Sequence, residues 1–240
     1  MNIVFGLCGQ GRRFQKAGYV LPKYLLCYHG APMIYHSVET LKIPGRIYFV
    51  VLVEHLQKYS YLERMLMSIG DEIIPCYEHT QGAAETLLKA RPYIQDHSLP
   101  FVSANCDQYL DWSPNEFINN INDNPDISYI LTYKETSDKC SYIRQSQGFV
   151  VEVREKQVIS NEATVGVYHW AKTGDFFKDA EAMISSGIKE AGEYFVAPVY
   201  NWSISRGLQV KNYSLNEKEF WPVGTPEDLH NFVINSPNIS

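Results

Sequence analysis

The sequence predicts an α/β protein with three layers built around a mixed, mostly parallel sheet. Through the first half of the chain, short apolar runs rich in β-branched and aromatic residues alternate with segments of helical spacing, which places helices on both faces of a parallel sheet. Later, between about residues 141 and 170, strand-like runs follow one another without a helix. With 240 residues, 45% of them hydrophobic and 20% charged, the chain can bury a sizeable core.

The strands are predicted from runs rich in Val, Ile, Phe and Tyr that end in polar or turn-forming residues. In chain order they are NIVFGL (2–7), RIYFVVLV (46–53), EIIPCYE (72–78), LPFVSAN (99–105), DISYILTY (126–133), GFVVEV (148–153) and ATVGVYHW (163–170). Turn signals at Gln147-Gly148 and Ser160-Asn161 separate the later runs. We therefore expect a β-hairpin excursion around 141–170.

The helices are predicted from apolar residues that recur at helical spacing. They are expected near 34–41, 56–69, 83–90, 175–186, 193–205 and 226–233. Thr225 suits the N-cap of the last helix, because Glu227 and Asp228 fall in its first turn, at the positive end of the helix dipole. The final residues, 236–240, are expected to be frayed.

Composition and charge exclude several classes of protein. A formal net charge of −6 argues against a general nucleic-acid binder, which needs a basic face. No apolar run approaches the roughly 20 residues that a membrane helix requires. The opening MNIVFGLCGQG lacks the basic leader of a signal peptide. Five scattered cysteines without a CxxC pair fit neither a disulfide framework nor a zinc site, so we expect reduced thiols in a cytoplasmic protein.

A basic, glycine-containing loop follows the first predicted strand. Gly9 and Gly11 have no side chain to hold the backbone away from a ligand, so their N–H groups can approach phosphate oxygens. Arg13 and Lys23 can balance the charge of a triphosphate. The loop lacks the third glycine of a dinucleotide fingerprint and the GK[ST] of a P-loop. Taken alone, it is also compatible with a tight turn that carries solvated arginines.

Two further segments carry polar residues at positions suited to ligands. In HTQGAAETLLKA, Gln81 and Gly82 open a predicted helix, where a base edge could be read; an ordinary helix start is the alternative. Asp107 follows the strand at 99–105, at the carboxyl edge where open α/β sheets bind ligands. A carboxylate there can hold Mg²⁺, or it can cap a loop. Asp111 is interpreted as a surface residue or a cap.

Together these motifs resemble the signature of the sugar nucleotidyltransferases, the pyrophosphorylases that make nucleotide sugars. G-x-G-x-R-F, P-K-x-L and H-G-A-P-M-I occur in the family's order, and the resemblance covers nearly the whole chain. The matching residues are Gly9, Gly11, Arg13, Pro22, Lys23, Leu25, Gly30, Pro32, Met33 and Ile34. Arg12 departs from the Ser or Thr often found there. The resemblance implies the Rossmann-like nucleotide-diphospho-sugar transferase fold, as one domain over 1–235 with a nucleotide-binding part over about 1–110 and an acceptor-binding part over about 111–235.

The resemblance also assigns roles on the nucleotide side. Arg13 would stabilise the leaving pyrophosphate, Lys23 would neutralise charge around the α-phosphate, and Asp107 would hold the Mg²⁺ cofactor. Together with Lys156, Arg13 and Lys23 form the expected catalytic set. The expected nucleotide-binding residues are Leu7, Gly9, Gly11, Arg12, Gln81 and Gly82.

On the acceptor side, VREKQVIS and EATVGVYHW resemble the family's Glu-Lys pair and its glycine-containing strand. Lys156 would pair with the acceptor phosphate, Glu155 would bond an acceptor hydroxyl or orient the lysine, and Gly166 would let the backbone pass close to the acceptor. Glu193 and Tyr194 lie in a segment similar to one beside the same pocket. A solvated hairpin pair and plain core aromatics are the alternatives.

One position departs from the pattern. Many relatives carry an aspartate, the second metal ligand, two residues before the glycine of G-T-P, whereas this chain has Pro222 in FWPVGTPED. Proline cannot bind a metal. Either Asp107 works with water and phosphate oxygens alone, or another acid such as Glu193 or Asp228 substitutes.

The implied reaction transfers a nucleoside monophosphate from a nucleoside triphosphate to a phosphorylated small-molecule acceptor and releases pyrophosphate. CTP is slightly favoured, the acceptor would be a sugar 1-phosphate or a related phosphate monoester, and the product would supply capsule, lipopolysaccharide or other surface polysaccharide. No nucleic acid or membrane partner is expected, and a homo-oligomer stays open. The alternatives are a glycosyltransferase of related fold, which usually shows D-x-D where this chain has Asp107-Gln108-Tyr109, and an inactive nucleotide-binding module, which the missing aspartate favours.

Overall fold

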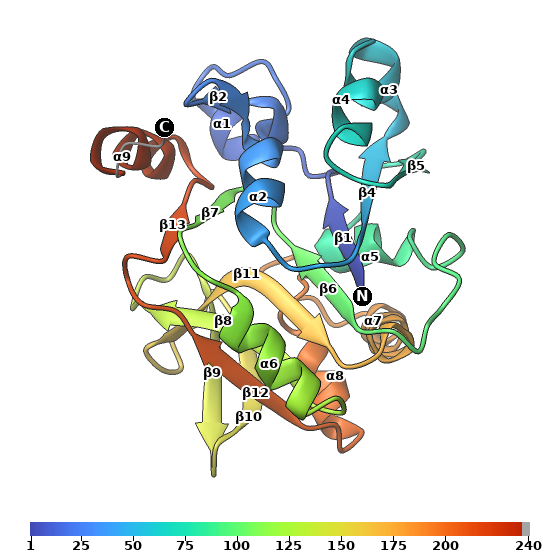
Figure 1. The fold of residues 1–240 in the computed structure, drawn as a ribbon, viewed down its shortest axis with the longest axis vertical. Helices are drawn as coiled ribbons and strands as arrows, with labels where there is room; N and C mark the ends of the chain where they lie inside the picture. Colours follow the sequence, from blue (N-terminus) through green and yellow to red (C-terminus); the bar gives the residue numbers. More distant parts are fainter. Residues whose placement is uncertain (237–240) are drawn as a thin grey trace.

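The computed structural model describes residues 1–236, and within them a nine-stranded mixed sheet forms the centre of the molecule (Figure 1). The strand order is β10-β9-β11-β6-β1-β4-β5, and β8 pairs with β11 and with β12. These strands are β1 (Asn2–Gly6), β4 (Arg46–Leu52), β5 (Glu72–Cys76), β6 (Phe101–Ala104), β8 (Ser128–Lys134), β9 (Ser141–Ser146), β10 (Phe149–Glu155), β11 (Glu162–Trp170) and β12 (Val210–Ser214).

One part of the sheet is parallel throughout, and the other contains antiparallel pairs, although β12 runs parallel to β8 there. In the first, β1 runs parallel to β4 and β6, with Asn2 opposite both Arg46 and Phe101, and β4 continues to β5. In the second, β11 is antiparallel to β6 and β8, and β9 and β10 form the expected hairpin around Gln147, whose φ of 51° suits its tight turn. The predicted fold class is confirmed: an α/β fold on a mixed, mostly parallel sheet.

Helices cover both faces of this sheet. The longer ones are α2 (Met33–Leu41), α3 (Val53–Lys58), α4 (Leu62–Met67), α5 (Ala83–Leu88), α6 (Asn115–Asp123), α7 (Thr173–Ser186), α8 (Val199–Ser205) and α9 (Pro226–Asn235). Alternate residues of β1 separate two cores, because successive side chains of a strand point to opposite faces. Val4 packs with the helices α5, α7 and α8, whereas Ile3 and Phe5 pack with α2, α4 and α6.

Short elements complete the fold around the carboxyl edge of β1 and β6. They are α1 (Arg12–Lys16), a 3-10 turn η1 (Lys23–Leu25), the pair β2 (Cys27–Tyr28) and β3 (Ala31–Pro32), and the pair β7 (Gln108–Leu110) and β13 (Phe220–Pro222). A third apolar cluster joins Phe14 of α1 to Phe232 of α9. The basic loop leads into α1, so α9, which is far away in the sequence, supports that loop through this cluster.

Two helices differ from their predicted ranges. The helix expected at 56–69 is split, because Tyr59 adopts an extended conformation between α3 and α4. The helix expected at 193–205 begins only at Val199, because the backbone N–H and C=O of Tyr194 are hydrogen-bonded to Gln81 and Ala84. By contrast, α9 begins where expected, and the Thr225 hydroxyl accepts a hydrogen bond from the Asp228 N–H.

Within the described residues, no helix combines the length and the apolar character that crossing a bilayer would take. The tail expected to fray, 236–240, falls at the end of the described part, and residues 237–240 lie outside it.

Candidate active site

A cleft of about 1110 Å³ lies at the carboxyl edge of β1 and β6. Its volume exceeds the roughly 300–1,000 Å³ of common small-molecule pockets. Most of the residues that the sequence singled out line it, from segments scattered through the chain. They are Gly9, Gly11, Arg12, Arg13, Lys23, Gln81, Gly82, Asp107, Glu155, Lys156, Gly166 and Glu193. Leu7 and Tyr194 do not line the cleft; both side chains are buried in the core.

An ion pair stands at the centre of the site. The ammonium Nζ of Lys23, at the start of η1, lies 2.6 Å from Oδ2 of Asp107, which follows β6. Burial by itself lowers the pKa of Lys23, but the carboxylate of Asp107 outweighs it and raises the pKa of the lysine above its ordinary value. Lys23 is therefore held as a cation, and about a quarter of its side chain, 24%, stays accessible.

The loop between β1 and α1 is open to the cleft. A Cβ added at Gly9 would meet no atom within 4 Å, whereas Gly11 has a φ of 61° and a Cβ added there would lie 3.2 Å from Cβ of Lys23. Within the described residues, the backbone N–H groups of residues 9–13 donate to no backbone carbonyl. Gly9 thus leaves room for a close approach to the backbone, while Gly11 is required by the turn that brings Lys23 alongside.

Gly82 is required by a contact that the sequence did not reveal. Its φ is 150°, and a Cβ there would lie 2.4 Å from both N and O of Tyr194. The Tyr194 N–H donates to Gln81 O at 3.0 Å, and the Ala84 N–H donates to Tyr194 O at 2.9 Å. Gly82 therefore lets two chain segments pack backbone to backbone, and the buried Tyr194 supports the start of α5.

The predicted acceptor pair lies at the end of β10. The carboxyl of Glu155 is buried and accepts a hydrogen bond from the Ser141 hydroxyl, and burial raises the pKa of Glu155 above its usual range despite that bond and the nearby Lys156. Lys156 has a φ of 55°, and its ammonium lies 4.8 Å from the ring centre of Phe195. The two side chains differ in environment. Glu155 is buried and bonded to Ser141, while the ammonium of Lys156 lies over the ring of Phe195 at the cleft.

Gly166 lies in a bulge of β11 that brings the backbone against the end of β6. Its φ is 88°, and a Cβ there would lie 2.4 Å from the amide nitrogen Nδ2 of Asn105 and 3.0 Å from Oε1 of Gln108. The Asn105 N–H donates to Gly166 O at 2.9 Å. The side chain of Asn105 thus occupies the space beside the Gly166 backbone that the missing Cβ leaves free, and Asn105 itself lines the cleft.

The segment with the missing aspartate does lie beside Asp107. Pro222 is paired with Gln108, the Val223 N–H donates to Asp107 O at 3.1 Å, and a Cβ on Gly224 would lie 2.8 Å from Oδ2 of Asp107. Gly224 therefore keeps space open beside the carboxylate. Mg²⁺ is often held by one or two carboxylates together with substrate phosphates, and the setting of Asp107 fits such a site.

No ready-made metal centre exists in the described part of the chain: no three His, Cys, Asp or Glu side chains within residues 1–236 are grouped so that they could hold an ion. Glu193 and Asp228, the two acids named as substitutes for the missing aspartate, both line the cleft. Either acid therefore lines the same cleft as Asp107 and stays a candidate for the second metal ligand.

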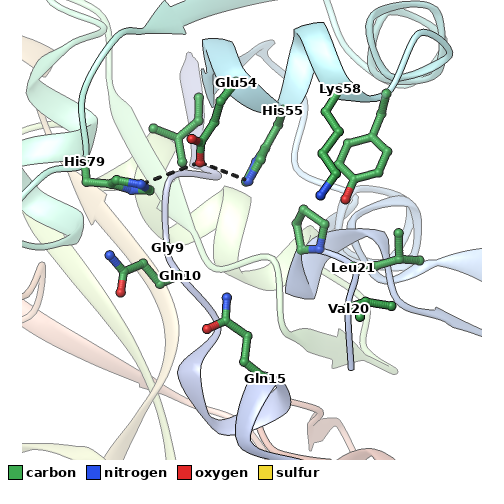
Figure 2. A pocket seen from close by; sticks show the side chains of 12 residues that line it. Gly9, Gln10, Gln15, Val20, Leu21, Glu54, His55, Lys58 and His79 are labelled. Carbon is green, nitrogen blue, oxygen red and sulfur yellow. Dashed lines mark ion pairs between the residues drawn. The ribbon is translucent and has the colours of Figure 1, made fainter. Parts of the chain in front are cut away.

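A smaller cavity of about 340 Å³ adjoins the cleft and shares Gly9, Gln10 and His79 with it. Figure 2 shows Glu54 between His55 and His79, with its Oε1 3.7 Å and 3.5 Å from their Nε2 atoms. Burial lowers the pKa of His55, although Glu54 acts in the opposite direction.

Sequence reasoning missed several cleft residues. Lys189, Ser141 and Asn105 contact predicted site residues from distant parts of the chain. Asn105 could have been found, because it follows β6 just as Asp107 does. Lys189 and Ser141 carry no local signal, since nothing in their sequence surroundings indicates which residue they meet.

No protein-family model matches the chain, and no curated protein matches its sequence. Solved structures do match in fold. The nucleoside-diphosphate-sugar pyrophosphorylase from Vibrio cholerae is 25% identical, with a TM-score of 0.82 over 97% of this chain and 100% of that one. A candidate glucose-1-phosphate thymidylyltransferase from Bacillus anthracis, solved with sucrose, is 18% identical, with a TM-score of 0.80 over 100% of this chain and 96% of that one.

The inositol-1-phosphate CTP transferase from T. maritima is 15% identical, with a TM-score of 0.76 over 99% of this chain and 96% of that one. The identities of 18% and 15% indicate a shared fold alone. The chain thus matches the structures of nucleotide-sugar pyrophosphorylases and nucleotidyltransferases over nearly its full length, as the resemblance in its motifs implied.

Proposed function

We propose that this chain is a nucleotidyltransferase, which transfers a nucleoside monophosphate from a nucleoside triphosphate to a phosphorylated acceptor and releases pyrophosphate. The observation that carries the proposal is the ion pair of Lys23 with Asp107, 2.6 Å long, in a cleft that the glycine loop and Lys156 both line. Cations from separate segments of the chain in one large cleft suit two phosphorylated substrates. The match in fold to the Vibrio cholerae pyrophosphorylase supports the same reaction class.

In the proposed reaction, an oxygen of the acceptor phosphate attacks the α-phosphorus of the triphosphate. A bond forms between that oxygen and phosphorus, the bond from the α-phosphorus to the bridging oxygen breaks, and pyrophosphate leaves with the electron pair. No protein nucleophile is needed, so the residues act by alignment and by stabilising charge. Lys23 and Arg13 would neutralise the triphosphate, and Lys156 would hold the acceptor phosphate.

Asp107 would hold Mg²⁺ together with phosphate oxygens, and the bound ion would neutralise charge that develops on those oxygens. The CTP preference, the sugar 1-phosphate acceptor and the use of the product in surface polysaccharide stay predictions from the resemblance in the sequence.

A matrix of nucleoside triphosphates against phosphorylated acceptors, scored by pyrophosphate release, tests the proposal. Lys23→Met and Asp107→Asn should each lower turnover by about a hundredfold or more, which is typical when one group that stabilises the transition state is lost. Lys178→Met removes an exposed lysine of α7 outside the cleft and should leave turnover unchanged. Near-normal rates in the Lys23 or Asp107 variant, with folding verified by circular dichroism, would overturn the proposal.

A second candidate, a nucleotide-binding module without catalysis, is favoured by Pro222 in place of a metal-binding acid. It predicts that triphosphates bind while no acceptor yields pyrophosphate. A glycosyltransferase would instead consume a nucleotide sugar and release a nucleoside diphosphate, so the identity of the released product separates all three.

A further inference from the structure

Gln81 presents its side chain from a backbone that is fixed on both sides. Its N–H donates to Oε2 of Glu85 at 2.7 Å, and its carbonyl accepts from the Tyr194 N–H at 3.0 Å. Gln81 lines the cleft just before the start of α5. A side chain held in this way is suited to reading the edge of a flat ligand.

Lys189 meets that carboxamide from a distant part of the chain. Its Nζ lies 2.6 Å from Oε1 of Gln81 and 5.0 Å from the ring centre of Tyr194, and Lys189 also lines the cleft. An ammonium can only donate, so it must bond the oxygen of the amide and leave the NH₂ group turned away from it. Within residues 1–236 that amide nitrogen donates to no side chain or backbone group.

We propose that Lys189 and Gln81 form a pair of adjacent donors that selects cytosine over uracil and thymine as the base of the nucleotide substrate. The inference rests on the proposed function and adds the base and the residue that imposes it. With its oxygen engaged by Lys189, Gln81 acts toward a ligand through its NH₂, and the ammonium contributes a second donor beside it. Lys189 is thus a specificity residue for the base.

Cytosine is the pyrimidine base that fits such an edge. Its ring nitrogen N3 and its oxygen O2 are neighbouring acceptors, whereas uracil and thymine carry a hydrogen on N3 between their two carbonyls. A donor facing another donor leaves both without a partner after water is removed, which discriminates more strongly than a lost apolar contact.

Equilibrium titration of the full chain with CTP and with UTP, in the presence of Mg²⁺, tests this without an acceptor. The wild-type chain should bind CTP at least tenfold more tightly than UTP. Lys189→Met keeps a side chain of similar length without the donor, and should bring the two affinities within about threefold of each other. Gln81→Glu keeps a partner for Lys189 but removes the NH₂, and should weaken CTP more than UTP. Lys178→Met, a charge loss elsewhere, should keep the wild-type ratio.

The outcomes separate the inference from the function on which it rests. If no nucleoside triphosphate binds the wild-type chain, the proposed function itself falls. If triphosphates bind but UTP equals CTP, or if Lys189→Met leaves the ratio of the two affinities unchanged, only the role of Lys189 and Gln81 is overturned. A lost preference in Lys189→Met with UTP affinity retained supports it.

Discussion

His169 is enclosed in the core between the aromatic rings of Phe117 and Tyr129, with 1% of its surface exposed. Within the described residues neither ring nitrogen has a hydrogen-bond partner. Burial lowers the pKa of His169 to about 3, so the imidazole stays neutral in the folded protein. A buried polar ring without partners costs stability, and the mechanism proposed above gives it no use.

This histidine makes stability depend on pH. Its pKa in the folded state lies below the unfolded value of about 6.5, so the unfolded chain takes up the proton first as the pH falls. Stability is fully present above about pH 6.5 and is lost toward pH 3, by about 2 kcal/mol between pH 6.5 and pH 5. His169→Phe should remove that loss and add about 1 kcal/mol to the free energy of unfolding at pH 7. Denaturant unfolding at pH 7 and at pH 5 measures both effects. An unchanged pH dependence in the variant would contradict the assignment.

Glu155 behaves in the opposite way. Burial raises its folded pKa above the unfolded value, so its contribution favours the fold at low pH and is lost as the pH rises through the folded pKa. Glu155→Gln removes the charge and keeps an acceptor for the Ser141 hydroxyl. The variant should equal or exceed the wild-type free energy of unfolding at pH 7, while the KM for the phosphorylated acceptor rises about tenfold. A strongly destabilised variant would show that the carboxylate is structural.

At the scale of single elements, the start of α5 depends on one glycine. Gly82 has a φ of 150° and lies against the backbone of Tyr194, so Gly82→Ala places a Cβ where backbone atoms already stand. We expect a loss of at least about 2 kcal/mol in the free energy of unfolding. Gly9→Ala is the matched control: it meets open space, so it should fold normally and lose affinity for nucleoside triphosphates instead. Equal stability of the two variants would refute the packing argument.

Elements also show why predicted ranges shifted. The apolar spacing of 193–205 is helical, yet the backbone of Tyr194 is hydrogen-bonded to Gln81 and Ala84, and the helix begins only at Val199. Pairing with a distant segment overrides local propensity there. Where the signal is local and uncontested, as in α9 with its Thr225 cap, the predicted and observed starts coincide.

At the scale of the whole molecule, the two ends of the described chain are coupled through one apolar cluster. Phe232 of α9 packs on Tyr28 and Tyr109, and the same cluster contains Phe14 of α1. The basic loop that carries Arg13 is therefore supported by a helix more than two hundred residues further along the chain.

Phe232→Ala should destabilise the fold by about 3–5 kcal/mol, because it opens a cavity in this cluster. Amide hydrogen exchange should show greater loss of protection in residues 10–28 than in β4, and the KM for the nucleoside triphosphate should rise. Phe177→Ala, a comparable truncation in the core under α7, provides the comparison. If both variants lose protection in the same regions, α9 does not support the loop specifically.

The amino-acid pattern was enough to predict the α/β class, most strands of the sheet, and three segments that line the cleft: the basic loop, Gln81-Gly82 and Asp107. These follow from features that a short stretch carries alone: the period of apolar residues, the freedom of Gly9, and the position of Asp107 after a strand. The order of the motifs also supported the expectation that Lys23 and Asp107 act together.

Which side chains meet became known from the folded chain alone. Lys189 reaches Gln81 across 108 positions, and Tyr194 became a buried support where a contact with the acceptor was expected. Gly82 and Gly166 are required by neighbouring protein atoms, Tyr194 and Asn105, which no local pattern indicates. The physical reason is that strand register and helix packing, set by burial over the whole chain, fix these contacts, whereas sequence patterns report only each segment's own backbone preference and its apolar face.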